Sequence, residues 1–584
     1  MAAGSFGQVV EPRVAEVQVG PADGPALVGL VRGAMAEYLA NRTGVEQQAI
    51  PDSLAHLERE QRTYAVSVTL RHEGRPVGRA IKSISLKNDR GISQPASVCR
   101  NVIAAALEAM RSEQLPDKIT PAYLDSLTVE VEILSPPAAV EPPPGRKVTG
   151  LDVDRMIFPG RTGLRVLRGA EIGYLLPTDG YTLGLDATGI RQAAVASVPQ
   201  SPANADMDWR YWLLESRHFV GYGDAVPNLA GRVLCLTRGK TLLPEMMASR
   251  EAVAEEIVKT LPFVAAHLAA NQTEDGLYAI GQAATPLRDH LAASCAMLRA
   301  GQRMKSEAIF ASGMKGLEYA VNLCHREDGK AYVATDPLDQ YGATAMLAHA
   351  MSLAPRNERS EALYGELIRA LLEGIGQDGW PSAQLDGGPA KSRPPLRDAL
   401  LAYMVLFGAA GTEEELASYA AMEKTLTAVW PGTAADALWR LRVGLRPVTP
   451  SPQSPPDPLA SVSQVLPGQG RDDELGGFAF ARQPASVELT ALALAVRSGG
   501  QGWTGQPMLA DPDKRAAQRS TMTIWAQAFV YTMMYRANEA YFSTDPATWL
   551  GAVRVDAGTA RVTPAACAAA IEILLMDATG PGEK

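Results

Sequence analysis

The stretch TPLRDHLAASC, residues 285–295, sets the architecture of the larger part of this chain. A threonine and a proline precede a helix-forming run rich in alanine and leucine, and proline suits the first helical position because its missing N–H costs nothing there. Related runs follow at DPLDQYGATAM (336–346), PPLRDALLAYM (394–404), WPGTAADAL (430–438), QPASVELTAL (483–492) and TPAACAAAI (563–571). A sixfold recurrence predicts one structural unit built several times.

Each recurring run is small or apolar on nearly every face, which predicts a buried helix. Amphipathic segments precede these runs, for example Arg250–Ala269, Glu307–Cys324 and Glu358–Leu372, and Gly-rich turns separate the two kinds of helix. An exposed helix, a turn and a buried helix repeated in this way predict an α/α toroid of about six helical hairpins over residues 244–578. The Pro-rich segment 446–458 is expected to be an irregular excursion.

The N-terminal part has a different pattern, which mixes strands and helices. After a tail over residues 1–24, the pattern predicts an α+β domain over 25–240. Its expected elements are a helix (27–39), a strand (64–70) with a return strand from Val77, a helix (98–110), an alternating strand (127–134), and two short strands (163–168 and 171–176) around Gly169. The strict alternation of residues 127–134 predicts one buried face and one solvated face.

Composition excludes several classes of protein. The chain has 584 residues, of which 46% are hydrophobic, and its formal net charge is −9. That charge disfavours general binding to nucleic acid. No apolar run reaches the roughly 18 residues needed to span a bilayer. The sequence therefore predicts a multidomain cytoplasmic protein without a membrane span or a secretory signal.

Two stretches of the N-terminal part resemble a known family. They are DKITPAYLDSLTVEVEILSPP (117–137) and GRTGLRVLRGAEIGYLLP (160–177), and both are similar to segments of the AMMECR-type domain, also called AmmeMemoRadiSam system protein A. The resemblance implies that family's α+β fold over about residues 25–240. The family carries a distinctive cysteine after its first hairpin, and Ala80 stands at that place in this chain.

The turns of the C-terminal part resemble a second family. FVAAHLAANQTEDGLY (263–278) is similar to the QW repeat of squalene cyclases and protein prenyltransferases, and the same element recurs at Gly316–Tyr332 and Gly374–Trp380. The resemblance implies a toroid of that type. The Asp-x-Asp-Asp motif of the cyclases does not occur, and no set of Asp, Cys and His has plausible zinc-ligand spacing. We therefore expect no metal site and no cofactor.

Candidate site residues follow from position in the expected toroid, because the inner helices begin at a central cavity. The expected cavity residues are Arg288, Asp289, His290, Asp339, Gln340, Tyr341, Arg397, Asp398 and Glu488, with Tyr278, Tyr332 and Trp380 on the turns. The Arg-Asp pairs either tie adjacent helices together or bind a ligand. A catalytic site would draw its acid and base from Asp289, His290, Asp339 or Asp398.

Two functional hypotheses follow from these residues. In the first, the chain is a non-catalytic binding or scaffold protein that uses the toroid cavity or surface for a small-molecule or protein ligand. In the second, the toroid is an enzyme acting on a carbohydrate or an isoprenoid in its cavity.

Overall fold

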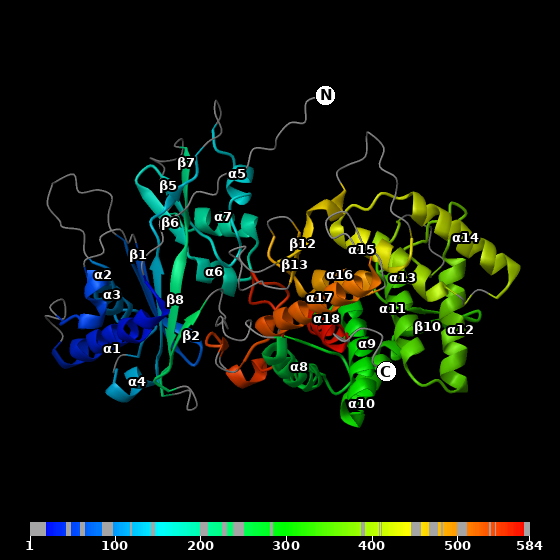
Figure 1. Cartoon of the computed structure of the whole chain (residues 1–584), viewed down its shortest axis with the longest axis horizontal. Helices are drawn as coiled ribbons and strands as arrows, with labels where there is room; N and C mark the ends of the chain where they lie inside the picture. The colour runs from blue at the N-terminus through cyan, green and yellow to red at the C-terminus, as the bar shows by residue number, and fades with distance from the viewer. Residues whose placement is uncertain are drawn as a thin grey trace. The chain divides into compact units, whose positions relative to one another are not determined.

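The computed structural model divides the chain into two compact units, which we describe separately (Figure 1). Unit 1 comprises Met1–Leu242, Ala537–Thr548 and Gly558–Ala560, and unit 2 comprises Leu243–Arg536, Trp549–Ala557 and Arg561–Lys584. The described residues are 19–41, 48–58, 65–83, 97–116, 119–141, 147–198, 208–224, 230–236, 250–280, 284–386, 392–407, 409, 411–445, 457–465, 477–480, 483–498, 511–536, 539–543 and 545–576. The Pro-rich segment 446–456 lies outside them.

Unit 1 has an α+β composition. Its helices are α1 (Gly24–Asn41), α2 (Ala55–Glu58), α3 (Val98–Ala109), α4 (Pro121–Ser126), α5 (Gly150–Asp154), α6 (Pro177–Thr182) and α7 (Ala187–Ala196). Its strands are β1 (Ala65–His72), β2 (Arg75–Ser83), β3 (Thr128–Leu134), β4 (Ala138–Ala139), β5 (Gly163–Arg168), β6 (Glu171–Leu175), β7 (Trp209–Leu214), β8 (Ser216–Gly221) and β9 (Val233–Leu236). The two hairpins expected from the sequence are the pairs β1–β2 and β5–β6.

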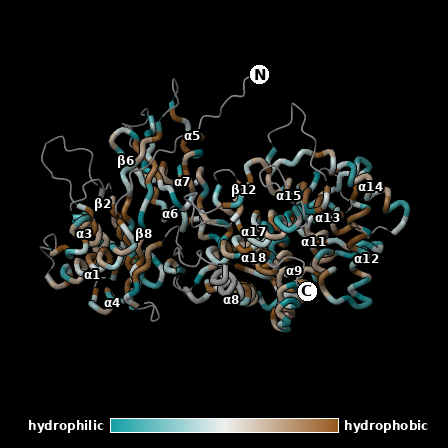
Figure 2. Tube along the Cα trace, in the orientation of Figure 1, coloured by the Kyte–Doolittle hydropathy of each residue, from teal (hydrophilic) through white to brown (hydrophobic). Residues whose placement is uncertain are grey.

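These strands make two antiparallel sheets. One has the order β2-β1-β3-β8-β9, and the other has the order β4-β7-β5-β6. α1 and α3 cover one face of the first sheet and share a hydrophobic core with it, visible as brown segments in Figure 2. Ala80 of β2 lies in this core and is 5% exposed.

The expectation of a solvated face on β3 is wrong. All seven residues of β3 are buried, including Glu130 and Glu132. Glu130 is paired with Arg71 of β1 and lies 3.3 Å from His218 Nε2 of β8. Burial alone would raise the pKa of Glu130, but these two partners outweigh it and hold that pKa at about 2.

Unit 2 is built mainly from helices. They are α8 (Arg250–Ala270), α9 (Leu287–Met304), α10 (Glu307–Asn322), α11 (Gln340–Leu353), α12 (Glu358–Glu373), α13 (Leu396–Leu406), α14 (Glu413–Ala428), α15 (Ala434–Arg442), α16 (Val487–Ser498), α17 (Pro512–Met533) and α18 (Pro564–Leu575). Two short hairpins pair β10 (Cys324–Glu327) with β11 (Lys330–Val333) and β12 (Val462–Gln464) with β13 (Phe478–Phe480).

Six helices of unit 2 contact one another in succession. The order of contacts is α9, α11, α13, α15, α16 and α18, and α18 in turn contacts α9. We call these six the inner helices. The helices that follow them in the chain pack on them: α10 on α9, α12 on α11, α14 on α13, and α17 on α16. α17 also packs on α18. The described residues before α16 form η6 (Pro458–Ser461), β12 and β13 rather than the expected amphipathic helix.

The inner helices and the helices that pack on them, which we call the covering helices, begin in different ways. The covering helices α10, α12 and α14 begin at Ser306, Asn357 and Thr412, whose side chains accept a backbone hydrogen bond from the first turn. Among the inner helices, α18 has its proline at the first helical position as expected, whereas Pro286 and Pro395 are the N-cap residues of α9 and α13.

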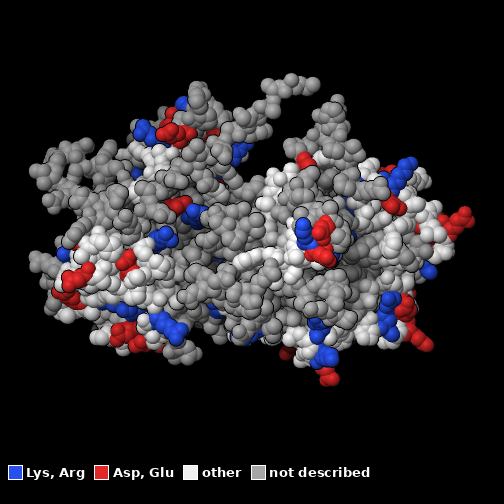
Figure 3. Space-filling view, in the orientation of Figure 1, with Lys and Arg blue, Asp and Glu red and all other residues white. Residues whose placement is uncertain are grey.

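No helix within the described residues is long and apolar enough to cross a membrane. On the face seen in Figure 3, the described acidic and basic side chains lie interspersed.

Candidate functional site

The inner helices of unit 2 surround a cavity of about 630 Å³. Pockets of this size are typical of small-molecule sites. Most of its lining is apolar, with alanine, leucine and methionine side chains from α9, α11, α13, α16 and α18, and the aromatic rings of Trp439 and Phe480. The charged lining residues are Arg288, Asp289, Arg299, Arg397, Asp398, Arg442, Glu488 and Glu572.

Helical periodicity explains which residues reach the cavity. On α9 they include Arg288, Ala292, Cys295 and Arg299, spaced by four, three and four residues, with Asp289 next to Arg288. Arg397, Leu401 and Met404 repeat this spacing on α13. Residues at this spacing share one face of a helix, so each inner helix presents a single stripe to the cavity.

One charged group lies where α9 and α13 begin. Arg288 Nη1 donates to both carboxylate oxygens of Asp398 at 2.7 Å, and Arg288 Nη2 donates to Asp339 Oδ1 at 2.9 Å. Burial raises the pKa of Asp398, and Arg288 opposes that shift. These contacts tie the starts of three inner helices together, so this ion-pair network has a structural role.

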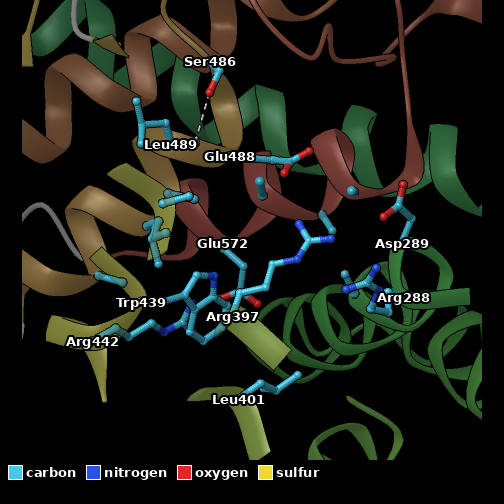
Figure 4. Close-up of a pocket in the computed structure, with 18 of the residues that line it drawn as sticks. Arg288, Asp289, Arg397, Leu401, Trp439, Arg442, Ser486, Glu488, Leu489 and Glu572 are labelled. Atoms are coloured by element: carbon cyan, nitrogen blue, oxygen red, sulfur yellow. Dashed lines mark hydrogen bonds between the residues drawn. The ribbon is translucent and has the colours of Figure 1, made fainter. Parts of the chain in front are cut away.

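Two other carboxylates in the same region have no such partner. Within the described residues, the side chains of Asp289 and Glu488 make neither a hydrogen bond nor a close ion pair. Burial raises the pKa of Asp289, with Arg397 and Arg288 opposing, while burial and the charge of Asp289 raise that of Glu488. The charge of Arg397, which also lines the cavity, opposes both shifts (Figure 4). We call Asp289 and Glu488 the carboxylate pair, since the pKa of each is raised and the charge of Asp289 acts on Glu488.

A second charged group lies three helical turns further along α9. Arg299 Nη1 donates to Glu572 of α18 at 2.7 Å, and Arg299 Nη2 lies 3.4 Å from His349 Nε2. Burial, Arg299 and Arg442 lower the pKa of His349 to about 4, so this imidazole is neutral at pH 7. The Arg442 guanidinium carbon lies 4.7 Å from the centre of the Trp439 ring.

Three expected site residues on the inner helices do not line the cavity. The His290 ring is fully buried, accepts a hydrogen bond from Tyr278 N at 3.2 Å, and lies 2.8 Å from the Gly316 carbonyl oxygen through Nε2. Gln340 Oε1 accepts from Leu385 N at 2.9 Å, and the buried Tyr341 hydroxyl donates to the Leu371 carbonyl. All three side chains therefore form hydrogen bonds with backbone groups of neighbouring segments.

The aromatic residues on the turns also lie elsewhere. Tyr278 is fully buried, with its hydroxyl 3.0 Å from Ser312 Oγ. Tyr332 lies on β11 beside the ring of His325. Trp380 is 8% exposed and packs under Arg393 at a separate surface pocket.

The cavity lining contains five residues predicted from the sequence, namely Arg288, Asp289, Arg397, Asp398 and Glu488. It also contains five residues that were not predicted, namely Arg299, His349, Trp439, Arg442 and Glu572. A signal for one of them was present, because Arg299 follows Arg288 by three helical turns. No group of three or more metal-ligating side chains occurs within the described residues.

No family model matches the chain. Three archaeal proteins resemble part of it. A protein of Thermococcus gammatolerans is 33% identical over 155 residues, 26% of this chain and 68% of that protein. A protein of Methanothermobacter thermautotrophicus is 30% identical over 28% of this chain and 76% of its own length. Protein TK0174 of Thermococcus kodakarensis is 31% identical over 26% of this chain and 68% of its own length.

A solved structure of the uncharacterised Protein PH0010 from Pyrococcus horikoshii also aligns with the chain. It has 22% sequence identity and a TM-score of 0.30, and the alignment covers 38% of this chain and 100% of that protein.

Proposed function

Since the chain belongs, over about a quarter of its length, to the family of archaeal proteins that includes Protein TK0174, we propose that unit 1 is an AMMECR-type domain. The segments 117–137 and 160–177 support this assignment, since they contribute β3, β5 and β6 to its two sheets. With Ala80 in its core, unit 1 has no thiol to perform cysteine chemistry at that position.

We further propose that the helical part of unit 2 is an α/α toroid. The succession of contacts from α9 to α18 and back to α9 supports six inner helices in a closed ring. The covering helices occupy the outer positions of such a ring.

We propose that the protein is a binding protein that holds a small, mainly apolar molecule in this cavity. The observation that carries the proposal is the cavity itself, about 630 Å³ of space lined mostly by apolar side chains. Filling such a space removes apolar ligand surface from water, which stabilises the complex by about 25 cal/mol per Å². A carbohydrate would leave many hydroxyl groups unpaired against this lining.

Two adjacent alanines of α9 provide a matched test. Ala292 lines the cavity, whereas Ala293 is fully buried in the surrounding core. Ala292→Phe is expected to fill the cavity, abolish binding of decan-1-ol measured by calorimetry, and leave stability nearly unchanged. Ala293→Phe is expected to overpack the core and destabilise the protein by about 1–3 kcal/mol. Full decanol affinity in stable Ala292→Phe protein would reject the cavity as the binding site.

The carboxylate pair favours a second function, acid–base catalysis on a ligand in the same cavity. Of the four acid–base candidates, Asp339 and Asp398 are both paired with Arg288. The ring of His290 is hydrogen-bonded to backbone groups. Asp289 therefore remains as a candidate, and its charge acts on Glu488. We expect Asp289→Asn and Glu488→Gln each to abolish turnover of an isoprenoid or glycoside substrate without weakening its binding. Unchanged turnover in both variants would exclude this mechanism.

A further inference from the structure

Arg442 is a partly buried cation without a close anion of its own among the described residues. It is the last residue of α15, and it lines the cavity. Within the described part of the chain its guanidinium makes no hydrogen bond and no ion pair; its close contact is the Trp439 ring at 4.7 Å. Desolvation lowers the pKa of Arg442; the charge of Glu572 opposes that shift, and Arg299 adds to it. An unpaired charge in such surroundings is costly unless a ligand pairs with it.

The neighbouring groups do not neutralise this cation. The charge of Glu572 acts on Arg442, but its carboxylate already accepts a hydrogen bond from Arg299 at 2.7 Å. His349 is neutral at pH 7, and the Cys295 thiol, whose pKa burial raises to about 12, is neutral as well. Arg299, Arg442 and Glu572 together therefore leave one net positive charge at this end of the cavity.

Much of the remaining cavity lining is apolar. Met346, Leu401, Met404 and Met576 line the same cavity, and the Trp439 ring lies against the guanidinium (Figure 4). A guanidinium held by a ring retains donors for an incoming oxyanion, since Arg binds carboxylates and phosphates through two parallel hydrogen bonds.

We propose that Arg442, held against Trp439, binds the single anionic group of a ligand whose hydrocarbon body fills the rest of the cavity. The ligand class is a carboxylate or phosphate monoester on an apolar chain. This inference rests on the proposed function, because it assigns the polar end of the ligand in the same cavity.

The test uses three probes of equal chain length on the full-length protein: decan-1-ol, decanoate and decyl phosphate. We expect wild-type protein to bind at least one of the two anions about tenfold or more tightly than decanol, as measured by calorimetry at pH 7.5. The stronger of the two anions identifies the head group.

Variants then assign the preference to Arg442. Arg442→Gln is expected to bind the anion and decanol equally, with decanol affinity unchanged, and Arg442→Lys is expected to recover part of the preference. Arg356→Gln is the matched control, because Arg356 also lies over a ring, that of Tyr364 at 4.3 Å, but pairs with Glu361 outside the cavity lining. It is expected to retain the full preference.

The outcomes separate the two proposals. Equal binding of decanol and both anions by the wild type would overturn the anion subsite while leaving the cavity as an apolar binding site. An anion preference that persists in Arg442→Gln would overturn the assignment to Arg442. If no probe binds the wild-type protein, the proposed function itself fails.

Discussion

Asp289 and Asp398 face the same cavity, but different contacts hold them. Asp398 accepts two hydrogen bonds from Arg288, whereas Asp289 has no such donor. Asp398→Asn should therefore lower the free energy of unfolding by about 1–3 kcal/mol, because Arg288 loses its ionised partner. Asp289→Asn should match or exceed wild-type stability at pH 7, since it removes a desolvated charge. Denaturant titrations of both variants measure the difference.

The pH dependence of Asp289→Asn follows from the raised pKa. Below the ordinary value of 3.8, the aspartate is neutral in both the folded and unfolded states, and the variant should equal the wild type. As the pH rises from 3.8 through the higher folded pKa, the wild type loses stability relative to the variant. A stability difference that stayed constant from pH 3.5 to 7 would contradict the raised pKa.

His290 is expected to make the stability of the protein depend on pH in the opposite direction. Desolvation lowers its pKa from 6.5 to about 4, so the folded state resists a proton that the unfolded state accepts. As the pH falls from 6.5 towards 4, this group should cost the wild type up to about 1.4 kcal/mol of stability per pH unit. His290→Gln should be less stable at pH 7 but show a shallower loss between pH 6.5 and 4.5 in urea unfolding.

At the scale of elements, glycine sets how closely α9 and α10 approach. A Cβ at Gly316 of α10 would lie 2.5 Å from Ser294 Oγ and 2.8 Å from the Tyr278 ring. The helices meet at small residues here, and a methyl group would force them apart. Gly316→Ala should therefore lower the melting temperature by several degrees.

Gly365 of α12 provides the control for that change. It is exposed, and a Cβ there would meet no atom within 4 Å. Gly365→Ala should stabilise the protein by about 0.5–1 kcal/mol, because alanine loses less backbone entropy in a helix. Equal effects of the two substitutions would mean that close packing at Gly316 contributes nothing.

Sequence periodicity predicted the helices and strands better than it predicted the burial and the contacts of their side chains. The helices at 98–110 and 358–372 and the strand at 127–134 match α3, α12 and β3 closely. Alternation could not reveal that the polar face of β3 is covered, because Arg71 and His218 come from other strands. The same limit applies to His290, whose partners Tyr278 and Gly316 lie in flanking segments.

The part of the site at the starts of the inner helices was predictable from the sequence, and the part further along them was not. Proline-marked helix starts pointed to Arg288, Asp289 and Arg397, since position along a helix follows from local sequence. Nothing local distinguishes Arg442, which lies against Trp439, from the neighbouring Arg440, whose guanidinium is buried against the carbonyl groups that end α14. That distinction depends on which face of α15 meets the cavity.

At the scale of the whole molecule, a short distant segment completes unit 1. Tyr541 is 2% exposed, with its ring 5.5 Å from that of His218 and under the guanidinium of Arg71. Tyr541→Ala in the full-length protein should speed amide hydrogen exchange in β1, β3 and β8 and leave exchange in α9 unchanged. Unaltered exchange in these strands would show that the segment does not stabilise the sheet.

The return of residues 537–548 to unit 1 has a consequence for synthesis on the ribosome. The chain that forms the sheet leaves the exit tunnel about 300 residues before Tyr541 does, which at 5–20 residues per second is a delay of about 15–60 s. During that interval Glu130 and His218 are not yet covered by residues 537–548. The nascent sheet is therefore incomplete, and accessible to chaperones, until residues 537–548 have left the ribosome.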